Sequence, residues 1–242
     1  MTTIYVDSRL SASGSDSDFT ITLRETVQIQ QGARLRVDKI RFIDSFFSTD
    51  LGRYVYYKDG SGGIVYHTLP EMAYTGTRLA AQLQALTGRN TTYSDVTNAI
   101  TQVVVVGQEF LSDDDLSAYT SFPSDASSSN PKSINNVLGP ISFDSDSIVF
   151  RFVKMSPYDD LFLRSHKLAC HNIHGPRGEH DVLCKIVLDQ GISRVQTGET
   201  PLNIYYDISP TSLKSIDFRL TDYLGKVVNL RGRSLSFQVT ID

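Results

Sequence analysis

The sequence predicts an all-β protein, an antiparallel β-sandwich carrying one helical insertion. The C-terminal stretch is the first reason. Large apolar residues alternate strictly with polar ones over 235–241 and also over 216–220. A period of two indicates strands with one buried and one polar face. The polar, turn-like segment between these runs predicts that they are neighbouring antiparallel strands. Helical periodicity, by contrast, is convincing in one segment alone.

Composition is that of an ordinary globular protein. The 242 residues are 40% hydrophobic and 21% charged, with a net charge of −4 and two cysteines. The small negative charge argues against a nucleic-acid binder that works through bulk positive charge. Two cysteines make no disulfide framework. The N-terminus shows no signal-peptide pattern, and no apolar run reaches the length of a membrane span. We expect one jelly-roll domain over 1–242, with a surface excursion at 107–140.

The N-terminal half reads as strands and turns. Strands are expected at 4–6, 19–23, 34–47, 54–57, 64–67, 90–96 and 100–106. The apolar positions of the third change parity near Asp38 and Lys39, which predicts a β-bulge there. The segments 54–57 and 64–67 flank Asp-Gly-Ser-Gly-Gly at 59–63, which predicts a hairpin.

The convincing helix follows this hairpin. Leu79, Leu83 and Leu86 fall on one face, Thr75 or Thr77 can cap its start, and Gly88 can end it. We expect it to cover a sheet edge.

Segment 107–130 contains no Lys or Arg and is rich in Ser and Asp. It reads as a surface excursion. Ser112 followed by three Asp predicts a helical turn there, and 134–138 predicts another. Further strands are expected at 147–153, 161–163, 181–188 and 202–206.

No catalytic motif is found. There is no phosphate-binding loop, dinucleotide fingerprint or serine elbow, and the paired carboxylates lie in turn-like contexts. We therefore expect no catalytic residue, no cofactor and no enzymatic activity.

One cluster contains residue types that commonly bind metals, so a metal site is compared with other interpretations of it. Its members are His166, Cys170, His171, His174, His180 and Cys184. All but His166 are candidate zinc ligands, yet the cysteines sit singly, without a Cys-x-x-Cys pair. A Cys170–Cys184 disulfide is an alternative, and ordinary core and loop residues are the favoured interpretation. No metal site is assigned.

Several short segments in order resemble one family. They are 4–9 (Ile-Tyr-Val-Asp-Ser-Arg), 17–23, 74–79, 133–139, 160–165 and 216–222, followed by the closing strand. Together they are similar to the penton-type single jelly-roll minor capsid proteins of polinton-like, adintovirus-like and virophage-like double-stranded DNA viruses. Pro140 departs from the pattern, because an aromatic residue is expected there.

The resemblance implies a virion structural protein. It implies a jelly roll standing upright in the capsid, with five copies around each icosahedral vertex and contacts to the major capsid protein. It implies no enzymatic activity. Loops at one end, including 107–130, would face outward and could meet a fibre or a host receptor. The protein would be made in the host cytoplasm or nucleus and not secreted. Since neither end carries a basic arm, packaging the genome would fall to other proteins.

Other interpretations remain open. A trimeric fibre head or receptor-attachment module is also a β-sandwich, although no repetitive shaft precedes Ile4. A cellular sandwich domain that binds carbohydrate or protein is a third possibility. Under the penton interpretation the sandwich sides form the contacts, so we expect Gln238 and Thr240 to be exposed and a charge there to impair assembly.

Overall fold

The computed structural model describes residues 1–242 except 106–108, 145, 170–173, 189–194 and 199–204. The chain forms two compact units. Unit 1 contains 1–45 and 158–242, and unit 2 contains 46–157. Among the described residues, none of the helices has the length and apolar character that crossing a membrane requires.

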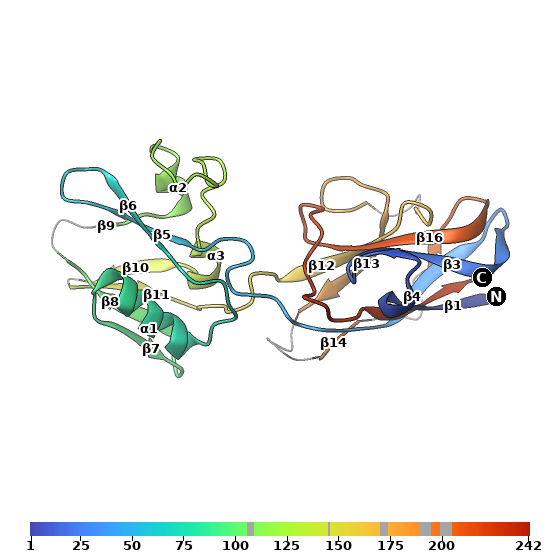
Figure 1. Ribbon diagram of the computed structural model, residues 1–242, viewed down its shortest axis with the longest axis horizontal. Coiled ribbons are helices and arrows are strands. Elements are labelled where there is room, and N and C mark those ends of the chain that lie inside the picture. The colour runs from blue at the N-terminus through green and yellow to red at the C-terminus, as the bar shows by residue number, and fades with distance from the viewer. Residues whose placement is uncertain (106–108, 145, 170–173, 189–194, 199–204) are drawn as a thin grey trace. The chain divides into compact units, whose positions relative to one another are not determined.

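Unit 1 is an antiparallel β-sandwich (Figure 1). One sheet has the order β1 (Thr2–Asp7), β17 (Ser236–Ile241), β4 (Arg34–Ile43) and β14 (Val195–Gly198), and β15 (Tyr206–Asp207) also pairs with β4. The other has the order β13 (Val182–Val187), β12 (Asp160–Arg164), β16 (Thr211–Thr221), β3 (Asp18–Ile29) and β2 (Ser13–Gly14). The short 3₁₀ helix η1 (Ser8–Leu10) follows β1.

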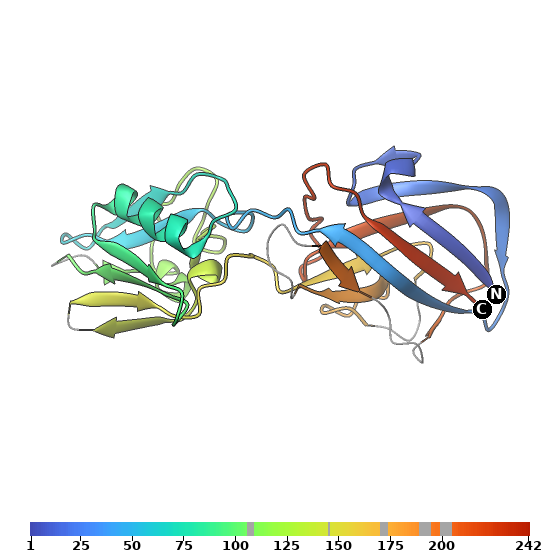
Figure 2. The ribbon, with the colours of Figure 1, turned by 90° about the horizontal axis from the view of Figure 1, so that it is seen from below.

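The strand order is that of a jelly roll. Numbering the eight main strands along the chain, with β2 and β15 left aside, the sheets read 1-8-3-6 and 5-4-7-2. Such an order interleaves two Greek keys, which defines the double-sheet jelly roll. The expected all-β class is confirmed. Figure 2 shows β1, β17 and β4 side by side, with the two chain ends adjacent.

One expectation about the C-terminal strands is wrong. The runs at 216–220 and 235–241 form β16 and β17, yet these strands belong to different sheets and are not hydrogen-bonded neighbours. Their buried faces pack against each other across the core instead. Alternation shows which face of a strand is buried, but it does not show which strand is its neighbour. Two strands joined by a long turn can bury their apolar faces either as hydrogen-bonded neighbours in one sheet or across the core from each other in two sheets.

The predicted bulge in β4 is confirmed. Opposite β17, the register moves from Asp38↔Gln238 to Arg41↔Ser236, so the segment from Asp38 to Arg41 is one residue longer than its partner. Lys39 has a positive φ of 53°. Because of the extra residue, Val37 and Ile40 both point into the core and both are fully buried.

Among its described residues, unit 2 contains two small sheets, the helix α1 (Gly76–Thr87) and two short helical turns. One sheet has the order β6 (Ile64–Thr68), β5 (Tyr54–Lys58) and β9 (Glu109–Phe110). The other has the order β10 (Ile141–Asp144), β11 (Ser147–Phe150), β8 (Ala99–Val103) and β7 (Thr91–Ser94). The predicted β5–β6 hairpin is confirmed, whereas β10 was not expected.

The helices of unit 2 begin and end close to the predicted residues. α1 (Gly76–Thr87) is capped by the Thr75 side chain and ends at Gly88, whose φ is 69°. α2 (Asp113–Leu116) has a full capping box made by Ser112 and Asp115. α3 (Asn135–Leu138) is the second predicted turn. Leu79 and Leu83 of α1 join Ile100 and Phe150 in the core of this unit.

All eight jelly-roll strands belong to unit 1. The excursion expected at 107–140 lies within unit 2, which extends from 46 to 157. Whether both units unfold as a single domain over 1–242 stays a prediction. One calorimetric transition would support it, and two would contradict it. The strand expected at 202–206 falls largely on residues outside the described part of the chain.

Candidate interaction surfaces

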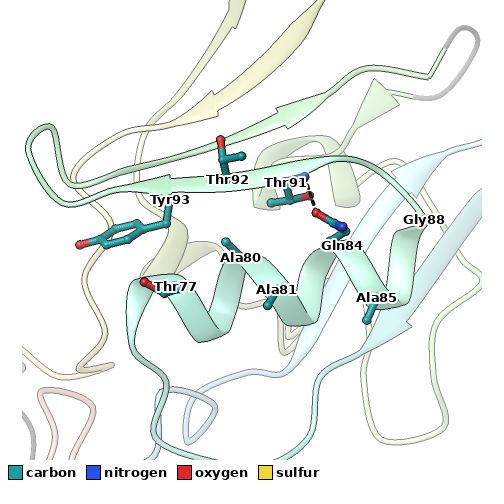
Figure 3. Close-up of a pocket in the computed structure, with 9 residues that line it drawn as sticks. All are labelled: Thr77, Ala80, Ala81, Gln84, Ala85, Gly88, Thr91, Thr92 and Tyr93. Atoms are coloured by element: carbon teal, nitrogen blue, oxygen red, sulfur yellow. Dashed lines mark hydrogen bonds between the residues drawn. The ribbon is translucent and has the colours of Figure 1, made fainter.

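A groove runs between α1 and β7 on unit 2 (Figure 3). Its volume is about 620 Å³. Six of the lining residues lie along α1 and at its C-cap, and they are Thr77, Ala80, Ala81, Gln84, Ala85 and Gly88. Thr91, Thr92 and Tyr93 of β7 complete it. Small side chains on the helix flank keep the groove open beside the strand.

A buried polar network lies behind β7. Tyr57 Oη donates to Gln102 Oε1 at 2.8 Å, and Gln102 Nε2 donates to Thr91 Oγ1 at 3.1 Å. The Arg89 guanidinium lies 4.0 Å from the centre of the Tyr57 ring. Burial raises the pKa of Tyr57 to about 12, so this phenol stays protonated and donates at physiological pH. Burial, together with Arg89, lowers the pKa of His67.

Two large apolar side chains are exposed on β1 and on the 3₁₀ helix η1 that follows it. β1 ends the first sheet of unit 1, and Tyr5 on its polar face is 78% exposed. Leu10 of η1 is 82% exposed. We call Tyr5 and Leu10 the β1 patch. A large aromatic residue on the polar phase of an alternating strand is the sequence signal for this exposed position, and no prediction was based on it.

A second apolar patch lies on the turn after β16. Tyr223, Leu224 and Val227 are all exposed, and we call them the turn patch. Buried Asp222 holds the turn rigid, because its Oδ1 accepts from the N–H groups of Leu224 and Lys226, both at 2.9 Å. Apolar residues inside a turn were the signal missed here.

An ion network covers the outer face of the second sheet. Arg164 of β12 and Arg219 of β16 are register partners. Asp181 accepts from both, at 2.8 Å from Arg164 Nη1 and 2.7 Å from Arg219 Nη2. Arg164 Nε also donates to Thr221 Oγ1 at 2.8 Å. Asp181 thus allows two like charges to stand opposite each other.

The structure brings His174 and His180 of the His/Cys cluster together and turns Cys184 away from them. Cys184 is buried on β13 opposite Leu163, on the core side of the sheet. The rings of His174 and His180 lie 4.6 Å apart, and His166 Nδ1 is 3.6 Å from Asp181 Oδ2. Within the described part of the chain, no three His, Cys, Asp or Glu side chains form a group that could hold a metal.

Cys170 and His171 lie outside the described residues. The zinc and disulfide hypotheses therefore stay predictions. Elemental analysis of the purified chain and of a His174→Ala variant tests the first, and thiol titration tests the second.

The expectation that Thr240 is exposed is wrong. Thr240 is fully buried on β17, and its Oγ1 donates to Asp38 Oδ2 at 3.3 Å. Arg36 Nε lies 3.0 Å from the same carboxylate oxygen. Gln238 is only partly buried, and its Nε2 donates to Thr240 Oγ1. Thr240 is covered locally, because its side chain packs on Asp38 of the neighbouring strand β4, whereas Ser236 and Gln238 on the same face keep partial exposure.

The acids of the 107–130 excursion have local structural roles. Asp113 accepts from Ser133 Oγ and Asn135 Nδ2. Asp115 closes the capping box. Asp125 accepts from Tyr54 Oη at 2.6 Å and from Lys132 Nζ at 3.0 Å. The hydrogen bond from Tyr54 holds the pKa of Asp125 below its usual value. These side chains hold the excursion against β5 and 130–135.

Comparisons with known proteins find likenesses among solved structures alone. No protein-family model matches the sequence, and no curated protein does. Among solved structures, the selenomethionine-labelled mavirus penton protein aligns with 100% of this chain and 99% of its own, at 10% identity and a TM-score of 0.49. At this identity and TM-score, the likeness carries no conclusion about the function of this chain. The function is therefore argued from the residues of the chain itself.

Proposed function

We propose that this protein is a viral capsid structural protein, the penton, which forms homopentamers at icosahedral vertices and contacts a major capsid protein. The 1-8-3-6 and 5-4-7-2 strand order of unit 1 is the observation that carries the proposal. It is the jelly roll that the resemblance of the sequence segments to penton-type capsid proteins implies. The proposal assigns no catalytic residue and places the protein in the virion.

A ring of identical subunits makes a specific demand on the surface. Each copy contacts its two neighbours through two different patches, because the contacts around a rotation axis higher than two-fold are heterologous. Unit 1 exposes apolar side chains at two places along the chain, the β1 patch and the turn patch. Exposed apolar residues that cluster on rigid backbone are typical of contact sites.

The backbone under both patches is well held. The turn patch lies on the hydrogen-bonded Asp222 turn. β1 is paired with β17 along its whole length, from Thr2↔Ile241 to Asp7↔Ser236. A contact on pre-organised backbone loses little conformational entropy when it forms. We therefore assign the subunit contacts of the proposed ring to these two patches rather than to Gln238 and Thr240.

The first test is the absolute mass of the purified protein, by native mass spectrometry or light scattering. A pentamer supports the proposal, and a trimer favours a fibre head instead. If the protein is monomeric alone, it is next co-expressed with the major capsid protein of the same virus. Failure to enter the resulting shells at their vertices then contradicts the proposal.

Variants test the two patches. Tyr5→Asp and Leu224→Asp place a charge in each patch, and we expect both to fold normally and to lose assembly. Val96→Asp is the matched control, since Val96 is 91% exposed on a turn of unit 2. If all three variants assemble like the parent chain, neither patch is the contact.

A further inference from the structure

We propose that the groove beside β7 binds an extended, uncharged peptide segment of a partner protein, which adds a strand to the free edge of this sheet. The inference rests on unit 2 alone and is independent of the proposed capsid role.

The free edge is established by the hydrogen-bond phase of β7. Val103 N–H donates to the carbonyl of Asn90, so the backbone of Asn90 faces β8. In an antiparallel pair this direction alternates residue by residue. The backbone groups of Thr91 and Tyr93 therefore point away from β8, toward the groove. β7 also stands last in the sheet order β10-β11-β8-β7.

One of these edge groups already has a substitute partner. Thr91 N–H donates to the side-chain Oε1 of Gln84 at 3.2 Å, as the dashed line in Figure 3 shows. A strand carbonyl would occupy the same position as that amide oxygen. The carbonyl of Thr91 and both backbone groups of Tyr93 present the remaining pairing positions, which is the pattern that strand addition uses.

The groove has the length of a short strand. From Thr77 to Gly88 the helix flank rises about 16 Å. A five-residue extended segment spans about 17 Å. The flank below it bears Ala81 and Ala85, which are exposed and small, so alternate side chains of the segment have room to pack there.

The ends and lining define the chemistry of the occupant. None of the nine lining residues is charged, so the groove offers no partner for a charged side chain of the segment. The Tyr93 ring lies against Gly76, where a Cβ would come within 2.3 Å of it. This ring closes one end. The segment that fits is uncharged, with apolar residues at alternate positions facing the helix flank.

Edge protection alone is the competing interpretation. A helix laid along a sheet edge prevents unwanted pairing, and α1 contributes to this through Gln84. Gln84, however, satisfies only the N–H of Thr91. Protection predicts that no peptide pairs with β7, so the two interpretations differ in a measurable result.

The test is an amide NMR titration of the full chain with synthetic acetylated Ser-X-Ser-X-Ser amides, in which X is Val, Ile, Leu, Phe or Tyr. We expect at least one peptide to shift the amide signals of Thr91 and Tyr93 and to slow hydrogen exchange at Tyr93. The same peptide with methylated backbone nitrogens should not bind, since it lacks the N–H donors for pairing.

Two helix variants complete the test. Ala81→Glu puts a long charged side chain into the groove, and we expect this variant to bind the peptide at least tenfold more weakly than the parent chain. Gln82→Glu adds the same charge at a neighbouring position outside the lining and should bind as the parent chain does. If no peptide shifts these amides, if methylated peptides bind equally, or if Ala81→Glu has no effect, the proposal is wrong.

Discussion

The ring of Phe218 on β16 stands edge-on to the ring of Phe237 on β17, with centroids 4.8 Å apart and planes at 80°. Each strand belongs to a different sheet of unit 1, so this contact crosses the core. Phe19 of β3 adds a third ring, 5.9 Å from Phe218. The three rings fill the space between the sheets, and edge-to-face geometry is the arrangement that aromatic pairs prefer.

Truncating this contact should destabilise the chain strongly. Phe237→Ala removes a buried ring and leaves a cavity between the sheets, which costs about 3–5 kcal/mol of unfolding free energy. Urea unfolding measures it. Tyr5→Ala is the control, because Tyr5 is exposed and its loss should change the unfolding free energy by no more than about 0.5 kcal/mol. Equal effects at the two positions would contradict the core assignment.

Charge at the buried Thr240 position of β17 should affect folding before it affects assembly. Thr240→Asp sets a second carboxylate beside Asp38 in a covered position. We expect a loss of roughly 3 kcal/mol or more, the usual size for an uncompensated buried charge. Thermal unfolding of Thr240→Asp and of Tyr5→Asp distinguishes the positions. A Thr240→Asp variant as stable as its parent would mean that this face is open to solvent.

Asp181 should be essential for the stability of the second sheet of unit 1. Asp181→Asn removes the charge that lies between Arg164 and Arg219, whose side chains are 3% and 25% exposed. Arg164 then becomes a buried charge without full compensation, and we expect a loss of about 3–5 kcal/mol. Asp160→Asn is the matched control. It removes the more exposed Lys185–Asp160 pair, which contributes about 0–1 kcal/mol. Denaturant midpoints of the two variants should therefore differ clearly.

The excursion of unit 2 should loosen in acid through Asp125. The Tyr54 hydroxyl and the Lys132 ammonium hold the pKa of this carboxyl below its usual value. A lowered folded pKa stabilises the fold above the unfolded pKa of about 3.9, and the stabilisation is lost as the pH falls through the folded pKa. Tyr54→Phe should raise the pKa of Asp125, as an NMR titration of its carboxyl carbon would show. An unchanged pKa would exclude the hydroxyl as the cause.

Local sequence patterns predicted many features of the fold. The parity change near Lys39 located the bulge of β4, and the Asp-Gly-rich segment located the β5–β6 hairpin. Thr75 or Thr77 and Gly88 marked the ends of α1, because capping is a short-range interaction, and the structure chooses Thr75 as the N-cap. Ser112 did the same for α2. In each case the determining contacts lie within a few residues of one another.

The contact surfaces were less accessible to such patterns. Tyr5 and Leu224 looked like ordinary members of a strand and a turn, and only their exposure marks them as patches. The groove beside β7 depends on Ala81 and on the backbone phase of Tyr93, which meet only after α1 packs along the sheet. Cys184 and His174 looked like possible partners by spacing, but β13 turns the cysteine into the core.

The sequence by itself determined the core-facing apolar residues of the alternating strands, several of the turns, and where α1 and α2 begin. Period, turn chemistry and capping are properties of neighbouring residues, so they can be read in order along the chain. Only the tertiary structure decided that β16 and β17 face each other across the core, that Thr240 is covered, and that 46–157 forms its own compact unit. Sheet membership follows from pairings between residues far apart in the chain, such as Ile4↔Val239, and a local pattern does not specify its distant partner.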